Sequence, residues 1–181
     1  MFSKTLSFIF VMIFSMKASA GVFIEPVAGY AMGSLEDKSK YDSTGLMYGG
    51  RGGFSTMGFV IGAEYLMGQL EWEASGGSKS DFDHTYISAY AGYSLPIMLS
   101  FRAGYVFSNK IKGSLVEYSG SGLSFGVGYS IAPFIKLNFD YKILESDKQK
   151  VINTGVETTL TGENIIKNNE MFFSLSVPWG F

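Results

Sequence analysis

The sequence offers one side chain that could act as a general base near neutral pH. His84 is the single histidine of the 181 residues, and serines and aspartates stand close to it at Ser80, Asp81, Asp83 and Ser88. A histidine beside a carboxylate and a hydroxyl is the pattern used in nucleophilic hydrolysis. These residues therefore raise the hypothesis of a hydrolase, which depends on whether the fold brings them to one face.

A metal or thiol site has weaker support. The chain contains no cysteine, so disulfides and thiolate-metal ligands are excluded. A metal would need carboxylates, of which Glu71, Glu73, Asp81 and Asp83 are the nearest group, and these are interpreted more simply as a solvated acidic loop. We therefore expect no metal ligand, no cofactor and no catalytic residue.

A second group of charged residues lies in the middle of strand-like segments. In each segment large apolar residues occupy every second position, and the charged residues occupy the positions between them. These residues are Glu25, Arg51, Glu64, Arg102, Lys136, Asp140 and Lys142, with Glu170 as a further candidate at a loop end. Three or four acids thus meet four bases. If they share one interior, they form either a self-neutralising plug of ion pairs or a gated path for ions, and the pattern leaves both readings open.

Arg51 sits in the segment Gly49 to Gly53, which reads GGRGG. A phosphate-binding loop would need a helix after the glycines, and none is predicted. An RGG-type nucleic-acid segment would be disordered and repeated. We interpret these glycines as residues that ease curvature and make room around Arg51.

The elements that position these charges read as strands. Apolar side chains alternate with small or polar ones in eight runs, and beyond the first twenty residues no helical stripe is present. The runs lie at 22–33, 45–55, 58–72, 84–95, 97–108, 119–131, 134–145 and 168–181. The chain is therefore predicted to be all-β.

Alternation alone does not distinguish a barrel whose apolar residues face a protein core from one whose apolar residues face lipid. The lengths of the links between the strands and the positions of the aromatic residues make this distinction. The links near 56–57, 96 and 132–133 are very short, whereas the other links are long and charged. Aromatic residues also gather at both ends of the runs, as expected for girdles at two membrane interfaces. The prediction is an eight-stranded antiparallel up-and-down transmembrane β-barrel.

The first twenty residues have the layout of a secretory signal peptide. Lys4 precedes an apolar stretch from about Leu6 to Met16, and small residues precede a predicted cleavage between Ala20 and Gly21. Loss of Lys4 and Lys17 from the 14 basic residues leaves 12 against 16 acidic ones, a formal charge of about −4. This balance argues against a nucleic-acid partner. We expect a signal peptide at 1–20 and a barrel domain at 21–181.

The C-terminal segment MFFSLSVPWGF places large apolar residues at alternate positions up to the last residue. Here the sequence resembles the small eight-stranded outer-membrane barrels of Gram-negative bacteria, of the OmpA, OmpX and opacity-protein type. In that family such an ending is the recognition signal for the barrel assembly machinery, so the resemblance implies this machinery as a partner. The matching positions are Phe173, Leu175, Val177, Trp179 and Phe181. Pro178 departs from the pattern, because proline cannot donate to a ladder.

The resemblance also frames the function. It implies insertion in the outer membrane lipid bilayer, periplasmic termini, long extracellular loops and a monomer. The leading hypothesis is a non-enzymatic barrel with a structural or adhesion-like role, whose loops bind an extracellular protein or another surface ligand. A narrow pore for ions or small solutes is the alternative. A lipid hydrolase is third, because related lipid deacylases carry His-x-Ser whereas this chain has His84-Thr85-Tyr86. The link from 146 to 167 is expected to project as a hairpin with a turn at 153–155.

Overall fold

The chain folds into one closed antiparallel sheet, seen in a computed structural model that describes residues 21–36, 40–74, 79–162 and 165–180. The predicted signal peptide, including Ala20, and the terminal Phe181 lie outside the described residues. The strands are β1 (Gly21–Glu36), β2 (Lys40–Thr56), β3 (Phe59–Ala74), β4 (Lys79–Ser94), β5 (Leu99–Lys112), β6 (Val116–Ala132), β7 (Ile135–Val151), β8 (Glu157–Thr159), β9 (Ile166–Ser176) and β10 (Trp179–Gly180).

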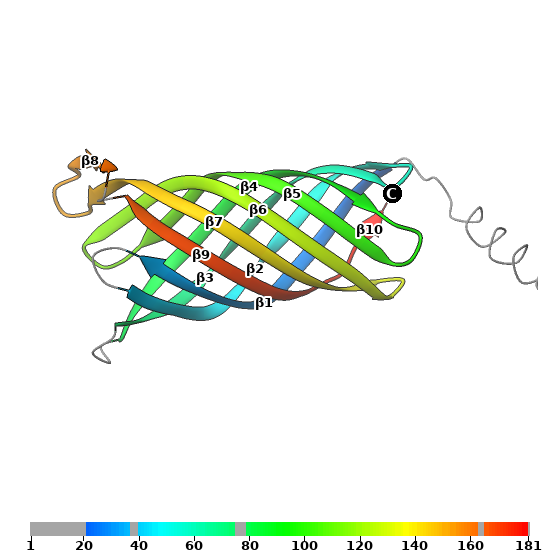
Figure 1. Cartoon of the computed structure of the whole chain (residues 1–181), viewed down its shortest axis with the longest axis horizontal. Helices are drawn as coiled ribbons and strands as arrows, with labels where there is room; N and C mark the ends of the chain where they lie inside the picture. The colour runs from blue at the N-terminus through cyan, green and yellow to red at the C-terminus, as the bar shows by residue number, and fades with distance from the viewer. Residues whose placement is uncertain (1–20, 37–39, 75–78, 163–164, 181) are drawn as a thin grey trace, which may run out of the picture.

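Successive strands from β1 to β7 pair with their neighbours, and β9 closes the ring by pairing with both β7 and β1. This closure confirms the predicted up-and-down barrel of eight strands (Figure 1). The predicted last strand is interrupted, because β9 ends at Ser176 and only the two-residue β10 follows, paired with β1. Pro178 lies in this interruption, where its lack of an N–H costs no ladder bond.

Alternation along the strands separates two faces. The outward parity carries an exposed apolar belt that includes Ile24, Phe101, Phe125, Phe139 and Leu175. The ends of this belt are marked by exposed aromatic residues, with Phe54, Phe59, Tyr93, Tyr129 and Trp179 at the short-turn end and Tyr30, Tyr48, Tyr65, Tyr105 and Phe173 toward the other. An apolar band between two aromatic girdles is the surface of a membrane-spanning barrel.

One end of the barrel has tight turns. Met57 and Gly58 join β2 to β3 with φ angles of 51° and 87°, and two positive φ values in sequence are the mark of a type I′ hairpin turn. Residues 95–98 and 133–134 make the other two connections at this end. The short links thus lie where the sequence predicts them.

The opposite end differs from the expectation of long loops. The strands continue well past the aromatic girdle, so that β1 and β2 are joined by residues 37–39, β3 and β4 by 75–78, and β5 and β6 by 113–115. A membrane crossing uses about 9–11 residues, whereas β2, β6 and β7 each have 17. Most residues that the sequence predicts to be in loops are therefore in paired strands that form hairpins. In these extensions the apolar side chains, such as Leu70 and Ile111, point inward and the charged ones outward, so the alternation is the reverse of that in the rest of each strand.

The longest connection also contains strand. β8 pairs with β7 through Lys148–Thr159 and Lys150–Glu157, and the chain reverses between Val151 and Val156. This confirms a projecting hairpin with its turn close to the predicted 153–155, although β7 pairs there with β8 and not with the last barrel strand. Figure 1 shows β8 at the end of the barrel opposite the C-terminus. The described residues include no helix with the length and hydropathy of a membrane span.

Candidate functional site: the barrel interior

Arg51 is the centre of the interior charges. Its guanidinium is buried and contacts three carboxylates: Nε donates to Glu64 Oε2 at 2.6 Å, Nη2 donates to Asp140 Oδ2 at 2.8 Å, and Nη1 lies 3.5 Å from Glu25 Oε1. The sheet register explains two of these contacts, because Arg51 stands directly opposite Glu25 on β1 and Glu64 on β3. Cross-strand neighbours on one face lie within side-chain reach.

Two of the glycines beside Arg51 are required by close backbone approach. A Cβ at Gly49 or Gly53 would overlap the carbonyl oxygen of Tyr65 or Ile61 on β3, whereas Gly50 and Gly52 point to the outer face and would meet only ordinary contacts. This matches the interpretation of the segment as a structural one. The inward glycines let β2 and β3 approach each other on both sides of Arg51.

The other three basic residues, Arg102, Lys142 and Lys136, each form an ion pair with a carboxylate on the same inner face. Arg102 donates from Nη2 to Asp140 Oδ1 at 2.9 Å and from Nη1 to Asn138 Oδ1 at 3.2 Å. Lys142 Nζ is 3.3 Å from Glu64 Oε1, and Lys136 Nζ is 3.7 Å from Glu25 Oε2. The structure therefore brings all seven sequence-predicted interior charges into one connected cluster.

Room for this cluster comes from β6. A Cβ at Gly126 would overlap Asp140 Oδ1 and would stand about 3 Å from the guanidinium of Arg102. Only glycine therefore fits between the two partners of this ion pair. The sequence shows Gly126 as one small residue among several, and only the register identifies its function.

His84 lies inside the barrel and is not open to the loop rim. It is 1% exposed, its Nε2 is 2.7 Å from Asn109 Oδ1, and its Nδ1 is 3.5 Å from the Tyr86 hydroxyl and 3.6 Å from Glu170 Oε2. Asp81 and Asp83 are exposed on the opposite face of the same strand. The fold therefore separates His84 from the two aspartates of the hydrolase hypothesis, whereas Ser88 is buried on the same face as His84.

Glu170 joins the interior set as its fourth carboxylate. It is fully buried, it stands opposite Lys142 in the register, and its oxygens make no hydrogen bond with the described residues. Lys142 Nζ also lies 4.0 Å from the centre of the Tyr86 ring, a cation–π contact. With Glu170 included, four carboxyl groups face four basic side chains, two arginines and two lysines, so acids and bases are equal in number.

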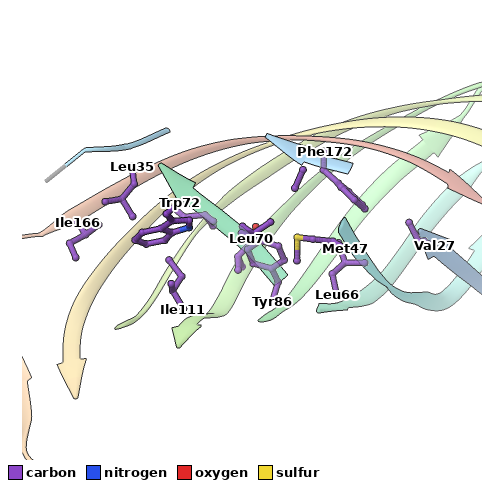
Figure 2. Close-up of a cluster of buried hydrophobic side chains, with 13 residues drawn as sticks. Val27, Leu35, Met47, Leu66, Leu70, Trp72, Tyr86, Ile111, Ile166 and Phe172 are labelled. Carbon is purple, nitrogen blue, oxygen red and sulfur yellow. The ribbon is translucent and has the colours of Figure 1, made fainter. Parts of the chain in front are cut away.

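The interior also contains an apolar layer, which overlaps the charged cluster, since Phe172 lies opposite Asp140, and extends past Glu170 toward the hairpins. Sequence reasoning missed this layer, because it assigns polar residues to the inward parity throughout. The layer consists of Val27, Ala31, Leu35, Met47, Leu66, Leu70, Trp72, Tyr86, Val106, Ile111, Leu144, Ile166 and Phe172, with Tyr41, Phe82, Tyr118 and Leu160 packed against it. Figure 2 shows ten of these side chains gathered between the strands.

The apolar layer is closely packed. Ala31, Leu66, Val106, Ile111 and Phe172 have no exposed surface. Trp72 stacks on Phe82 with ring centroids 4.2 Å apart. A barrel of eight strands is only wide enough for side chains to fill it, and here a charged layer and an apolar layer fill it in series.

The acidic residues near the hairpin tips are solvated, as expected. Lys79 Nζ lies 2.6 Å from Glu71 Oε1 and 3.8 Å from Glu73 Oε2, and all three side chains are about half exposed. The hydrogen bond from Lys79 to Glu71, with the charges of both glutamates, raises the pKa of the Lys79 ammonium. This group is a surface ion pair in the described structure.

Comparison with solved structures identifies the fold. Neisserial surface protein A is 17% identical, with a TM-score of 0.52 over 88% of this chain and 98% of its own. Ail, the attachment invasion locus protein of Yersinia pestis, is 12% identical, with a TM-score of 0.55 over 89% of this chain and 100% of its own. The structure of Ail in complex with the heparin analogue sucrose octasulfate is 14% identical, with a TM-score of 0.53 over 88% of this chain and 99% of its own. No protein-family model and no curated protein sequence matches the chain.

The chain is a small eight-stranded transmembrane β-barrel.

The residues predicted as an assembly signal lie along the seam of this barrel. Phe173 and Leu175 on β9 and Trp179 on β10 are exposed on the lipid-facing side, and Val177 lies in the break between the two strands. Phe173 packs on Phe139 of β7 with ring centroids 4.9 Å apart. The segment thus presents an apolar edge along the strand that closes the barrel.

Proposed function

We propose that this chain is a non-enzymatic integral protein of the bacterial outer membrane that acts by presenting its hairpins to a partner at the cell surface. The interior supports this proposal over the pore alternative. An ion needs a continuous wet path, but the charged layer is internally paired and the apolar layer beyond it is closely packed. The hairpin end is then the part of the barrel that remains available to a partner outside the membrane.

The hairpins suit such a role because they are held by backbone ladders. Their outward faces carry a row of alternating charges across neighbouring strands: Asp83 on β4, Lys112 on β5, Glu117 on β6, Lys150 on β7 and Glu157 on β8. Adjacent charges of opposite sign stabilise strand pairs. A partner would bind a polar surface of fixed shape. Binding would then cost little conformational entropy, because the hairpins are already ordered in the folded barrel.

The fold comparisons support an interaction role without assigning a ligand. One matched protein is described as a surface protein and another as an attachment invasion locus protein. In this proposal the termini are periplasmic, the assembly machinery recognises the segment from Phe173 to Phe181, and the barrel is a monomer. The lipid-hydrolase alternative receives no support from the buried His84.

The proposal is tested by shortening one hairpin. Replacing residues 149–158 with a two-residue Asn-Gly turn removes β8 and the tip of β7 but leaves the barrel strands intact. We expect a non-adherent bacterial strain that produces the chain to attach to host-cell monolayers, and the shortened variant to lose that gain. The matched control is Met57→Asn, which changes a turn at the opposite end and keeps a residue that tolerates positive φ.

Both variants must first show the heat-dependent gel shift of a folded barrel. Loss of attachment in the hairpin variant alone would support the proposal. Attachment that is absent in the parent chain, or equal in the parent and the shortened variant, would contradict it for this hairpin and these surfaces.

A further inference from the structure

A pocket opens into the barrel at the short-turn end, on the side of the charged cluster away from the apolar layer. Its volume is about 220 Å³, and its walls come from β1 to β5, from β7 and from residues 178–180. The inward residues near its mouth include Phe23, Ser55, Val60 and Ser94, and Pro178 closes one side. The barrel is therefore filled in its middle and at the hairpin end but hollow at this mouth.

The base of the pocket carries two cations. Glu25, Arg102 and Lys136 are the charged residues that line it, so two cations face one carboxylate. The carboxylate is already engaged, because Ser176 Oγ donates to Glu25 Oε1 at 2.5 Å and Arg51 contacts the same oxygen. Arg102 is in turn paired with Asp140 at 2.9 Å, whereas Lys136 Nζ lies 3.7 Å from Glu25.

Lys136 is the less firmly paired of the two cations. Among the described residues its one ion pair is the 3.7 Å contact with Glu25, and its side chain is 14% exposed toward the pocket. An ammonium group has three donors, so most of its capacity remains. The neighbouring Arg102 spends Nη1 and Nη2 on Asn138 and Asp140, which leaves Lys136 as the group best placed to hold an incoming ligand.

The residues of the pocket walls indicate what the uncharged part of a ligand would be. Phe23, Val60 and Tyr90 supply apolar surface, and the hydroxyls of Ser55 and Ser94 make no hydrogen bond within the described structure. Pockets for drug-sized ligands have volumes of about 300–1,000 Å³, so this one suits a smaller molecule. We propose that the pocket binds a small organic monoanion, with its carboxylate on Lys136 and Arg102 and a compact apolar body against the walls.

The test uses sodium benzoate as the probe and the refolded chain in nanodiscs of neutral, zwitterionic lipid, so that the membrane surface itself attracts no anion. Backbone amide chemical shifts are followed by NMR during the titration. We expect saturable shifts at the mouth, around Ser100, Arg102 and Lys136, with a dissociation constant in the millimolar range. Benzyl alcohol, which has the same ring without the charge, should produce no saturable shift there.

Two variants change the pocket by different means. Lys136→Gln removes the ammonium charge and should weaken benzoate binding about tenfold. Ser55→Phe fills the mouth without touching an ion pair, and should abolish binding even if the charged cluster adjusts to the first variant. Lys148→Gln is the matched control, because Lys148 is an exposed lysine at the hairpin end.

Weaker binding in Lys136→Gln and loss of binding in Ser55→Phe, with unchanged binding in Lys148→Gln, would establish the site. Absence of saturable shifts in the parent chain would overturn the proposal, as would equal benzoate binding in the parent, Lys136→Gln and Ser55→Phe. Equal shifts from benzyl alcohol would also overturn it, because they would show that charge is not recognised. The pocket and the hairpins lie at opposite ends, so the result is independent of the proposed surface function.

Discussion

Replacement of Arg51 by methionine tests the account of the charged layer most fully. The change removes a buried cation that contacts Glu25, Glu64 and Asp140 and leaves an apolar side chain of comparable length. Removing one partner of a buried ion pair costs about 3–5 kcal/mol, because the remaining charge stays buried without compensation.

The contacts of the three carboxylates indicate where in this range the loss of stability should fall. Each of the three carboxylates keeps one other cation: Glu64 keeps Lys142, Asp140 keeps Arg102 and Glu25 keeps Lys136. None is left wholly uncompensated, so we expect Arg51→Met to lower the free energy of unfolding by about 3 kcal/mol, the lower end of that range.

The assay is urea unfolding in lipid vesicles, followed by tryptophan fluorescence. The matched control is Lys79→Met, which breaks an exposed pair and should cost about 0–1 kcal/mol. The double variant Arg51→Met with Glu64→Gln should cost less than the sum of its single changes, because the two residues share one contact. A loss below about 1 kcal/mol for Arg51→Met, no larger than the control, would refute the assignment of Arg51 as the centre of the interior.

Three further changes test the other layers. Phe139→Arg puts a charge on the lipid face and should cost about 2–4 kcal/mol near mid-bilayer, with Phe139→Leu as the control; equal unfolding curves for the two would contradict the inside–outside assignment. Phe172→Ala opens a cavity in the apolar layer and should cost about 3–5 kcal/mol in the same vesicle assay, so a loss under about 1 kcal/mol would mean that this layer is loosely packed. Gly126→Ala inserts a methyl group between Asp140 and Arg102 and should cost about 1–3 kcal/mol; Gly52→Ala, whose Cβ would point outward with ordinary contacts, should have little effect, and equal losses for the two would remove the steric explanation.

Much of the fold follows from the sequence because membrane strands obey a strict period of two. Ile24 and Phe139 could be placed on the outer face, and Glu25 and Asp140 on the inner one, from alternation alone. The short turns were also visible, since little sequence lies between β2 and β3 or between β6 and β7. These are local signals, and each strand carries its own.

Contacts between distant strands could not be predicted in the same way. Lys142 meets Glu64, and Glu170 meets His84, only because the closed ring brings β7 and β9 near β3 and β4. A list of inward charges contains no information on which partner each one takes. The position of His84 inside the wall, away from Asp81 and Asp83, likewise depends on which face of β4 it occupies.

The apolar layer was missed for a different reason. Leu70 and Ile111 occupy inward positions in the parts of the strands nearest the hairpins, where outward neighbours such as Glu71 and Lys110 are charged. Beyond the aromatic girdle the outer face thus becomes polar and the inner face apolar. The outer face there is in contact with water, and the inner face must still be filled by side chains. Reading this exchange from sequence would require knowing where the membrane ends.

The most direct test of the central claim is the single-channel conductance of the refolded chain in a planar bilayer. The account predicts no discrete openings across the physiological range of voltage, because a charged layer and an apolar layer close the barrel in series. It also predicts silence for Arg51→Met, since the apolar layer remains in place. Regular, salt-dependent openings of the parent barrel would contradict the closed interior and would establish the pore in its place.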